Sequence, residues 1–148
     1  RLLLEITESA MLRLGDDIER TMQTLHTLGI EVAIDDFGTG YSSMAYLKLP
    51  AVAYLKIDRS FVTGLPGDSN DAAITEAMLA MAKSLGLTTI AEGIETEAQH
   101  DFLLRSGCME GQGYLYSYPL RPEEVQRLLC PNQPPVPARL KLVPPKRG

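Results

Sequence analysis

Two adjacent aspartates, Asp35 and Asp36, are the residues of this sequence best placed to do chemistry. They follow the apolar run 32–34 and precede a Gly38-x-Gly40 turn, which puts them where a buried strand ends. In folds with parallel strands, ligands bind at that end of the strand. Adjacent carboxylates repel each other unless a cation or a shared proton intervenes, and Mg²⁺ prefers oxygen ligands. The pair therefore predicts either a metal site or a solvated acidic turn.

Polar residues recur at the carboxyl ends of five apolar runs, and parallel strands would bring all of them to one edge of a sheet. They are Glu5, Asp35 with Asp36, Lys56, Glu92 with Glu95, and Gln112. This set suits metal-assisted phosphoryl hydrolysis, in which carboxylates hold one or two Mg²⁺ or Mn²⁺ ions that activate water. A lysine offsets charge on the phosphate oxygens and a free carboxylate accepts a proton. Any one of these residues is explained more simply as a polar strand end, but the recurrence favours a shared site.

The spacing of apolar residues predicts alternating strands and helices. Strands are expected at 2–6, 31–34, 54–58, 88–91 and 111–115. Helices are expected at 16–28, 69–85, 96–106 and 122–129, with a short helical stretch ending near Pro50. Thr96 and Gln99 form a capping box, and the core face of the helix 69–85 is expected to be Ile74, Ala77, Met78, Met81 and Leu85.

Such alternation indicates an α/β fold with a parallel sheet and right-handed crossovers. An eight-stranded (β/α) barrel typically needs about 250 residues. The chain has 148 residues. Its five β/α units therefore predict either a partial TIM-like barrel or an open doubly wound sheet.

The charge distribution separates a domain, residues 1–130, from a tail, residues 131–148. The tail holds four of the 14 basic residues, no acidic residue and six of the 10 prolines, so residues 1–130 have 10 basic against 19 acidic residues. That balance disfavours binding of a nucleic acid polymer and suits a site for metal cations. The tail is expected to be flexible. Cys108 and Cys130 lack metal-site spacing, and Cys108 is expected to be buried.

Five segments in this order resemble the EAL-domain family. They are LEITES (4–9), DDFGTGYSS (35–43), LKIDRSFV (55–62), AEGIET (91–96) and QGYL (112–115). Members of this family are bacterial phosphodiesterases that hydrolyse cyclic di-GMP to linear pGpG on a TIM-like barrel. The resemblance covers residues 1–120 or so and implies the same fold, substrate and divalent metal, Mg²⁺ or Mn²⁺, for the protein that contains this segment.

The resemblance also implies roles for single residues. Glu5 and Asp35 would bind the catalytic metal, and Asp36 would bind a second metal or orient the attacking water. Lys56 would contact that water or the scissile phosphate. Glu92 matches an essential carboxylate, either a metal ligand or a general base.

Supporting roles are implied as well. Gln112 and Glu95 would support the metal and water network. Glu8 would brace the loop after the paired aspartates, which starts with Phe37, Gly38, Thr39 and Gly40 and takes part in dimer contacts in the family. A homodimer or another self-associated state is therefore expected.

The sequence lacks residues that the family motif places upstream, namely the Glu-Ala-Leu segment with its metal-binding Glu and nearby Arg, an Asn ligand, and the first three strands. We therefore expect this chain to be the C-terminal part of an EAL domain with weak or no activity alone. The parent protein is expected to carry sensory or GGDEF-type domains upstream. The segment itself is expected to lie in the cytoplasm without membrane contact. The alternative is an inactive EAL module that serves as a cyclic di-GMP receptor or a protein-interaction domain.

Overall fold

The computed structural model describes residues 2–40 and 44–129, which fall into two units with the boundary between Tyr116 and Ser117. The first unit contains five strands, five α-helices and two short 3-10 helices, and the second contains α6. In chain order the elements are β1 (Leu3–Thr7), α1 (Glu8–Leu14), η1 (Gly15–Asp17), α2 (Ile18–Thr27), β2 (Glu31–Phe37), η2 (Tyr46–Lys48), β3 (Val52–Ile57), α3 (Arg59–Val62), α4 (Ser69–Ser84), β4 (Thr88–Glu92), α5 (Glu97–Arg105), β5 (Glu110–Gln112) and α6 (Pro122–Leu129).

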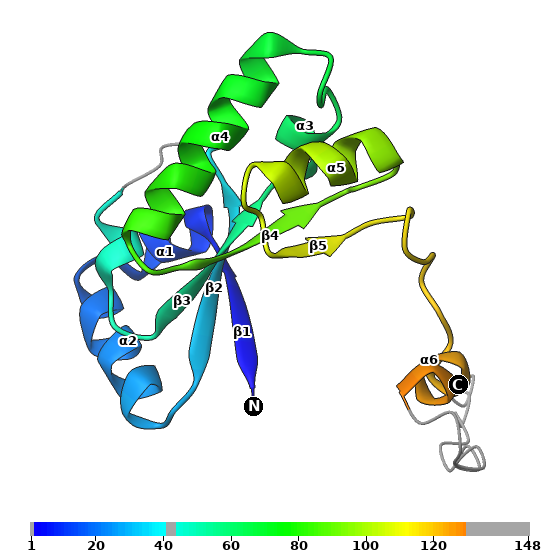
Figure 1. Cartoon of the computed structure of the whole chain (residues 1–148). Coiled ribbons are helices and arrows are strands. Elements are labelled where there is room, and N and C mark those ends of the chain that lie inside the picture. Colours follow the sequence, from blue (N-terminus) through cyan, green and yellow to red (C-terminus); the bar gives the residue numbers. More distant parts are fainter. Residues whose placement is uncertain (1, 41–43, 130–148) are drawn as a thin grey trace, which may run out of the picture. The chain divides into compact units, whose positions relative to one another are not determined.

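The five strands form one parallel sheet in sequence order, β1-β2-β3-β4-β5. In Figure 1 the helices of the first unit lie on one side of this curved sheet, and its concave side faces away from them. A strand order without reversal is the order of a β/α barrel, whereas a doubly wound sheet reverses at a switch point. The predicted partial barrel is therefore confirmed, and the open doubly wound alternative is wrong.

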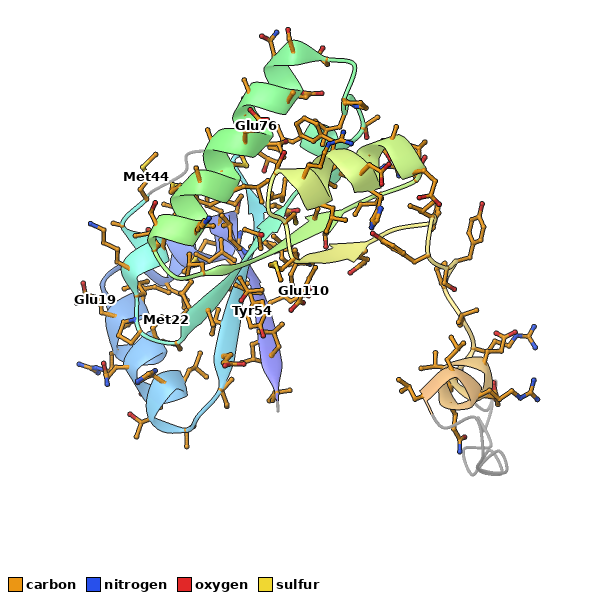
Figure 2. All side chains as sticks on the ribbon, viewed as in Figure 1. Glu19, Met22, Met44, Tyr54, Glu76 and Glu110 are labelled. Atoms are coloured by element: carbon orange, nitrogen blue, oxygen red, sulfur yellow. The ribbon has the colours of Figure 1, made fainter. Side chains whose placement is uncertain are left out.

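The hydrophobic core lies between the sheet and its helices. Leu55 and Ile57 of β3 are fully buried, and so is Met11 of α1, while Met22 of α2 is almost fully buried. Burying one such side chain contributes about 2 kcal/mol. Successive side chains of a strand point to opposite faces, so Tyr54 and Lys56 point to the concave side of the sheet, opposite to Leu55 and Ile57 in the core. Figure 2 shows Tyr54 and Glu110 on this side, so polar groups gather there.

Helix α1 is absent from the sequence prediction, which placed a single helix between the first two strands. Thr7 ends β1 in an extended conformation, and its hydroxyl accepts a hydrogen bond from the Ala10 N–H at 3.3 Å, so a new helix starts at once. Gly15, with a φ of 53°, ends α1. One threonine serves as both strand end and helix cap, and hydrophobic spacing does not reveal this.

The core face of α4 is also predicted incorrectly. Ile74, Ala77 and Leu85 are exposed, Met81 is partly buried, and Met78 alone of the predicted set is buried. The buried face consists of Thr75, Met78, Leu79 and Ala82. Both sets have helical spacing because this alanine-rich helix is apolar on several sides. The observed face buries the Thr75 hydroxyl, which donates to the Phe61 carbonyl at 3.5 Å.

The bounds of β1, β3 and β4 agree with the prediction to within two residues, whereas β2 continues three residues beyond the predicted 31–34, to Phe37, and β5 is shorter than predicted. The predicted strand 111–115 is observed as Glu110–Gln112. The chain turns at Gly113, whose carbonyl accepts from the Tyr116 N–H at 3.1 Å, and a side chain at Gly113 would collide with the Ile94 backbone. Crowding between two backbones therefore ends the strand. The capping box of Thr96 and Gln99 is confirmed.

The N-terminal cap of α4 provides a test of local stability. The Asp68 carboxylate accepts from the N–H groups of Asn70 at 2.7 Å and Asp71 at 3.1 Å. We expect Asp68→Ala to lower the free energy of unfolding by about 1 kcal/mol, since two helix N–H groups lose their acceptor. Urea denaturation followed by circular dichroism measures this. Glu76→Ala, which removes an exposed acid from the middle of the same helix, should have a much smaller effect, and equal losses would contradict the capping role.

Candidate active site

The Lys56 ammonium is the centre of the site. Its Nζ lies 2.9 Å from Glu5 Oε2, 3.0 Å from Asp35 Oδ1 and 2.6 Å from Glu92 Oε1. The four residues come from β1, β2, β3 and β4, four neighbouring strands of the sheet. Lys56 is only 4% exposed, so its charge has little access to water. The structure thus brings four of the predicted strand-end side chains together in one place.

The three carboxylates keep Lys56 charged. Burial alone would lower the pKa of its ammonium, but hydrogen bonds to Glu92, Glu5 and Asp35 outweigh burial and raise that pKa well above its ordinary value of 10.5. Lys56 is therefore a permanent cation over the physiological pH range. Three negative charges against one positive charge leave the cluster with a surplus of two negative charges.

Asp35 and Asp36 lie near the end of β2, where the chain enters a tight turn. Asp36 has a positive φ of 55°, and its N–H donates to Asp35 Oδ1 at 3.1 Å. Its carbonyl accepts from both the N–H and the hydroxyl of Thr39, at 3.2 and 2.8 Å. Burial, together with the neighbouring Asp35 and Asp58, raises the pKa of the exposed Asp36 carboxyl, while Lys56 lowers it. These mutual effects show that the Asp36 carboxyl lies close to Asp35 and Lys56, so Asp36 is a further acidic group beside the cluster.

The segment after Glu92 is fixed by its neighbours. The Gln99 side-chain oxygen accepts from the N–H groups of Glu95 and Thr96 at 2.8 and 2.9 Å, and its amide donates to the Thr63 carbonyl at 3.3 Å. The Ile94 N–H donates to the Gln112 carbonyl at 3.1 Å. These bonds connect α5, β5 and the residue after α3 to the strand end that carries Glu92.

Several predicted site residues lie differently from what the sequence suggested. The Glu5 side chain is 51% exposed rather than buried, because β1 is an edge strand of the described sheet. The Gln112 side chain is exposed, and it lines a cavity of ≈ 190 Å³ together with Glu92 and Tyr114. Glu95 forms an ion pair with Arg59 at 2.7 Å instead of joining the cluster. Arg59 is not among the predicted site residues, although it lies only two residues after the end of β3.

The loop residues are placed in part. Glu8 is buried at the start of α1, and Phe37 is buried at the end of β2. Gly38 has a φ of 92°, Thr39 closes the turn, and Gly40 is exposed. The predicted loop continues through residues 41–43, which lie outside the described residues, as does the predicted tail 131–148.

The cluster suits a divalent cation in both charge and chemistry. Its donors are carboxylate oxygens, which hard divalent ions prefer, and its charge surplus of two would be neutralised by one such ion. Glu5 and Asp35 would hold it together with the adjacent Asp36, and Glu92 lies beside them in the cluster. Glu97, His100 and Asp101 form a separate group close enough for a cation, but they lie on α5 with substantial exposure, and we assign them no role.

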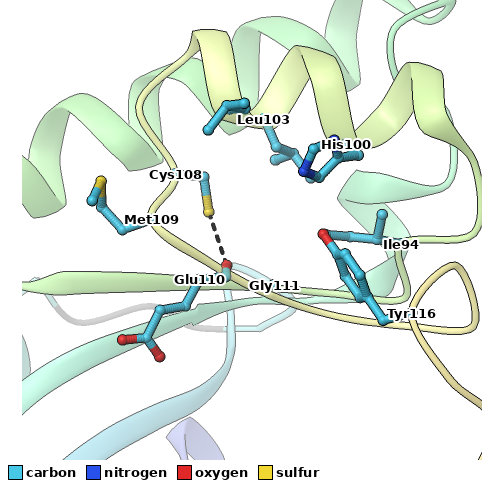
Figure 3. A pocket seen from close by; sticks show the side chains of 9 residues that line it. Ile94, His100, Leu103, Cys108, Met109, Glu110, Gly111 and Tyr116 are labelled. Atoms are coloured by element: carbon cyan, nitrogen blue, oxygen red, sulfur yellow. Dashed lines mark hydrogen bonds between the residues drawn. The ribbon is translucent and has the colours of Figure 1, made fainter.

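A small cavity of ≈ 60 Å³ between α5 and β5 lies apart from this site. Figure 3 shows the Cys108 thiol there pointing at the Glu110 carbonyl, at 3.3 Å, with the Glu110 side chain directed away. Burial raises the pKa of the Cys108 thiol. A buried thiol of raised pKa is unreactive, so Cys108 is a packing residue, and its predicted burial is confirmed.

The fold and the site define a β/α-barrel protein with an acidic, lysine-centred site at the carboxyl ends of its strands. The model of the EAL domain matches residues 1–119, and the chain belongs to the EAL-domain family.

Known relatives agree with this assignment. The chain is 47% identical over 124 residues to the bifunctional diguanylate cyclase/cyclic di-GMP phosphodiesterase MucR of Pseudomonas aeruginosa, covering 84% of this chain and 18% of MucR. The MucR phosphodiesterase structure, a complex with c-di-GMP, superposes with a TM-score of 0.78 over 84% of this chain and 50% of that chain.

Two further solved structures extend the comparison. The EAL domain of Mycobacterium smegmatis DcpA is 46% identical, with a TM-score of 0.80 over 90% of this chain and 60% of its own. Klebsiella pneumoniae BlrP1, solved with manganese and cyclic di-GMP, is 32% identical, with a TM-score of 0.73 over 79% of this chain and 30% of its own.

Substitution of Lys56 tests the electrostatics of the cluster. We expect Lys56→Met to lower the free energy of unfolding by about 2 kcal/mol, less than the roughly 3–5 kcal/mol of a fully buried pair because the carboxylates are partly exposed. The raised pKa of Lys56 means that its contribution is complete below the unfolded lysine pKa of 10.5 and is lost only as pH rises through the higher folded value. Denaturation should therefore give the same difference at about pH 7 and pH 9. Lys83→Met, which changes an exposed residue of α4, is the control, and an equal loss there would refute the assignment.

Proposed function

We propose that this chain is part of the catalytic domain of a phosphodiesterase that hydrolyses cyclic di-GMP to linear pGpG with Mg²⁺ or Mn²⁺. The convergence of Glu5, Asp35 and Glu92 on Lys56 is the observation that carries this proposal. MucR and BlrP1 are solved with the same nucleotide, and BlrP1 also with manganese. Because the chain spans half or less of the solved MucR and BlrP1 chains, the activity belongs to a longer protein.

Each residue of the cluster has a distinct part in the proposed reaction. Lys56, held charged by its neighbours, offsets the negative charge that develops on the phosphate oxygens. Glu92, 20% exposed and lining the cavity that Gln112 also lines, would accept the proton of the attacking water. Glu5, Asp35 and Asp36 would hold the divalent cation. When bound, that cation supplies Lewis-acid polarisation of the phosphate and activates water.

The tight turn at Asp36 fixes the direction in which the two aspartate side chains point. Two hydrogen bonds from Thr39 to the Asp36 carbonyl keep the backbone in its left-handed conformation. Both aspartates therefore project from one short stretch of rigid backbone, and little ordering is needed when ligands bind. Gln112 on β5 and Glu95 after β4 would support the metal and water network from the side of Glu92.

Other features of the protein stay predictions from the family resemblance. These are the domain boundary at residue 130, upstream sensory or GGDEF-type domains, dimerisation through the loop after Asp36, and a cytoplasmic location. Among the described residues, no helix is both long and apolar enough to cross a membrane. MucR, whose name includes a diguanylate cyclase, is an example of a relative with a second activity.

Loss of one carboxylate tests the catalytic proposal. In the full-length protein that carries this chain, we expect Asp35→Asn to reduce turnover of cyclic di-GMP by at least about 100-fold, because a ligand of the cation loses its charge. Chromatographic detection of pGpG with Mg²⁺ and Mn²⁺ measures this. The control is Asp101→Asn, the same substitution on exposed α5. Unchanged turnover in Asp35→Asn would remove its assigned role, and binding of cyclic di-GMP without turnover by the wild type would favour the receptor alternative.

The isolated 148-residue chain should behave differently from the full-length protein. We expect weak or absent turnover and self-association, because β1 and β5 end the described sheet with open edges that recruit other chains. Analytical ultracentrifugation over a range of concentrations, together with the turnover assay, tests this. A monomer with full turnover would contradict the prediction.

A further inference from the structure

Helix α3 occupies a special place beside the site. It begins three residues after Lys56, capped by Asp58, whose carboxylate accepts from the Ser60 N–H at 2.9 Å. Because β3 lies between β2 and β4 in the sheet, α3 leaves the sheet between the turn that carries Asp35 and Asp36 and the segment that follows Glu92. A helix of four residues at this point can contact both.

The first contact is with the aspartate turn. Gly38 stands two residues after Asp36 with a φ of 92°, and a side chain there would lie 3.3–3.4 Å from the Phe61 ring and would collide with Met78 Cε. Gly38 therefore rests directly on Phe61 of α3 and Met78 of α4. The Thr75 hydroxyl of α4 donates to the Phe61 carbonyl, which ties α3 to the core helix.

The second contact is with the segment that follows Glu92. Gly93 has a φ of 71°, and a side chain there would collide with Cβ, Cγ and Cδ of Arg59. The aliphatic stem of Arg59 thus lies across the Gly93 backbone, and its guanidinium reaches Glu95 at 2.7 Å. Both partners of that ion pair are substantially exposed, at 59% and 42%, and exposed pairs contribute little. Packing of the stem is therefore the main part of this contact.

The opposite side of the same segment is closed by β5. A side chain at Gly113 would collide with the Ile94 backbone, and the Ile94 N–H and carbonyl bond to Gln112 and Leu115. Residues 93–95 are consequently clamped between the Arg59 stem and Gly113. Removing one side of a clamp frees the backbone on which Glu92 depends for its position.

We propose that Arg59 and Phe61 are positioning residues. Through them, α3 keeps the carboxyl ends of β2 and β4, which carry the carboxylates, in a fixed position relative to Lys56. Arg59 acts on Glu92 through Gly93, and Phe61 acts on Asp35 and Asp36 through Gly38. Neither belongs to the cluster around Lys56, although Arg59 also lines the cavity that Glu92 faces. The inference rests on the proposed function for its effect on turnover, but the contacts themselves can be tested without it.

Amide hydrogen exchange in the 148-residue chain tests the contacts directly. We expect Arg59→Ala to speed exchange at the Ile94 and Glu95 amides at least several-fold, and Arg59→Met, which keeps an aliphatic stem, to leave them near the wild-type rate. Phe61→Ala should act instead at the Thr39 amide of the aspartate turn, with Phe61→Leu as the milder variant if Phe61→Ala does not fold. Arg20→Ala, which changes an exposed residue of α2, is the control. Unchanged exchange in Arg59→Ala overturns the proposal.

Kinetics of the full-length protein separate positioning from substrate contact. We expect Arg59→Ala to lower kcat about tenfold with KM within about twofold of wild type, and Arg59→Met to restore most of kcat. If Arg59→Met instead matches Arg59→Ala with a raised KM, the guanidinium binds substrate and the positioning role is refuted. A wild-type protein that does not hydrolyse cyclic di-GMP refutes the proposed function alone, because the exchange experiment still decides the contacts.

Discussion

The arrangement of this protein depends on one buried ammonium surrounded by three carboxylates. A lysine near the end of a buried strand is costly to bury unless its charge is compensated. Glu5, Asp35 and Glu92 provide that compensation from three other strands, all within 3.0 Å. The interaction is therefore long-range in sequence, and it forms only when the strands are parallel and in their observed register. Chemistry and fold are coupled through it, since any shift of β3 would separate Lys56 from all three partners.

The geometry of parallel strands explains why the groups converge. Neighbouring strands lie about 4.8 Å apart, which the long side chains of lysine and glutamate can span. The register pairs Lys56 with Ile90 and Asp35 with Thr7, so Glu92 and Glu5 reach the cluster from positions two residues away along their strands. Glu5 and Asp35 point to the same face as Lys56 because side chains of a strand alternate. The charge surplus of the cluster follows from the same geometry, because one lysine is matched with more acids than it can neutralise. A divalent cation is the simplest complement to that surplus.

Sequence reasoning predicted the parts of this structure that are governed by local patterns. The five strands, the caps at Thr96 and Gln99, and the strand-end polar residues all follow from residue types and spacing. The errors came where tertiary packing decides between equivalent local choices. α4 could bury either of two faces, and the position of Phe61 selects the one with Thr75. Glu5 lies on an edge strand, so its exposure depends on which strand is its neighbour, and a single strand's pattern does not contain that information. The local sequence does not identify Arg59, because its contact is with the backbone of Gly93, which is far away in sequence.

Gly38 and Gly93 have equivalent positions in the structure. Each follows a strand end that carries a carboxylate, each adopts a positive φ, and each leaves a gap that a side chain of α3 fills. A residue with a Cβ at either place would have to push Phe61 or Arg59 away, and with it the helix that continues directly from the Lys56 strand. The carboxylate turns and the lysine strand are thus connected twice, once by charge at Lys56 and once by close packing at α3. Charge alone would tolerate movement of flexible side chains, whereas backbone packing does not. The rigidity needed for the proposed chemistry therefore comes from the second connection.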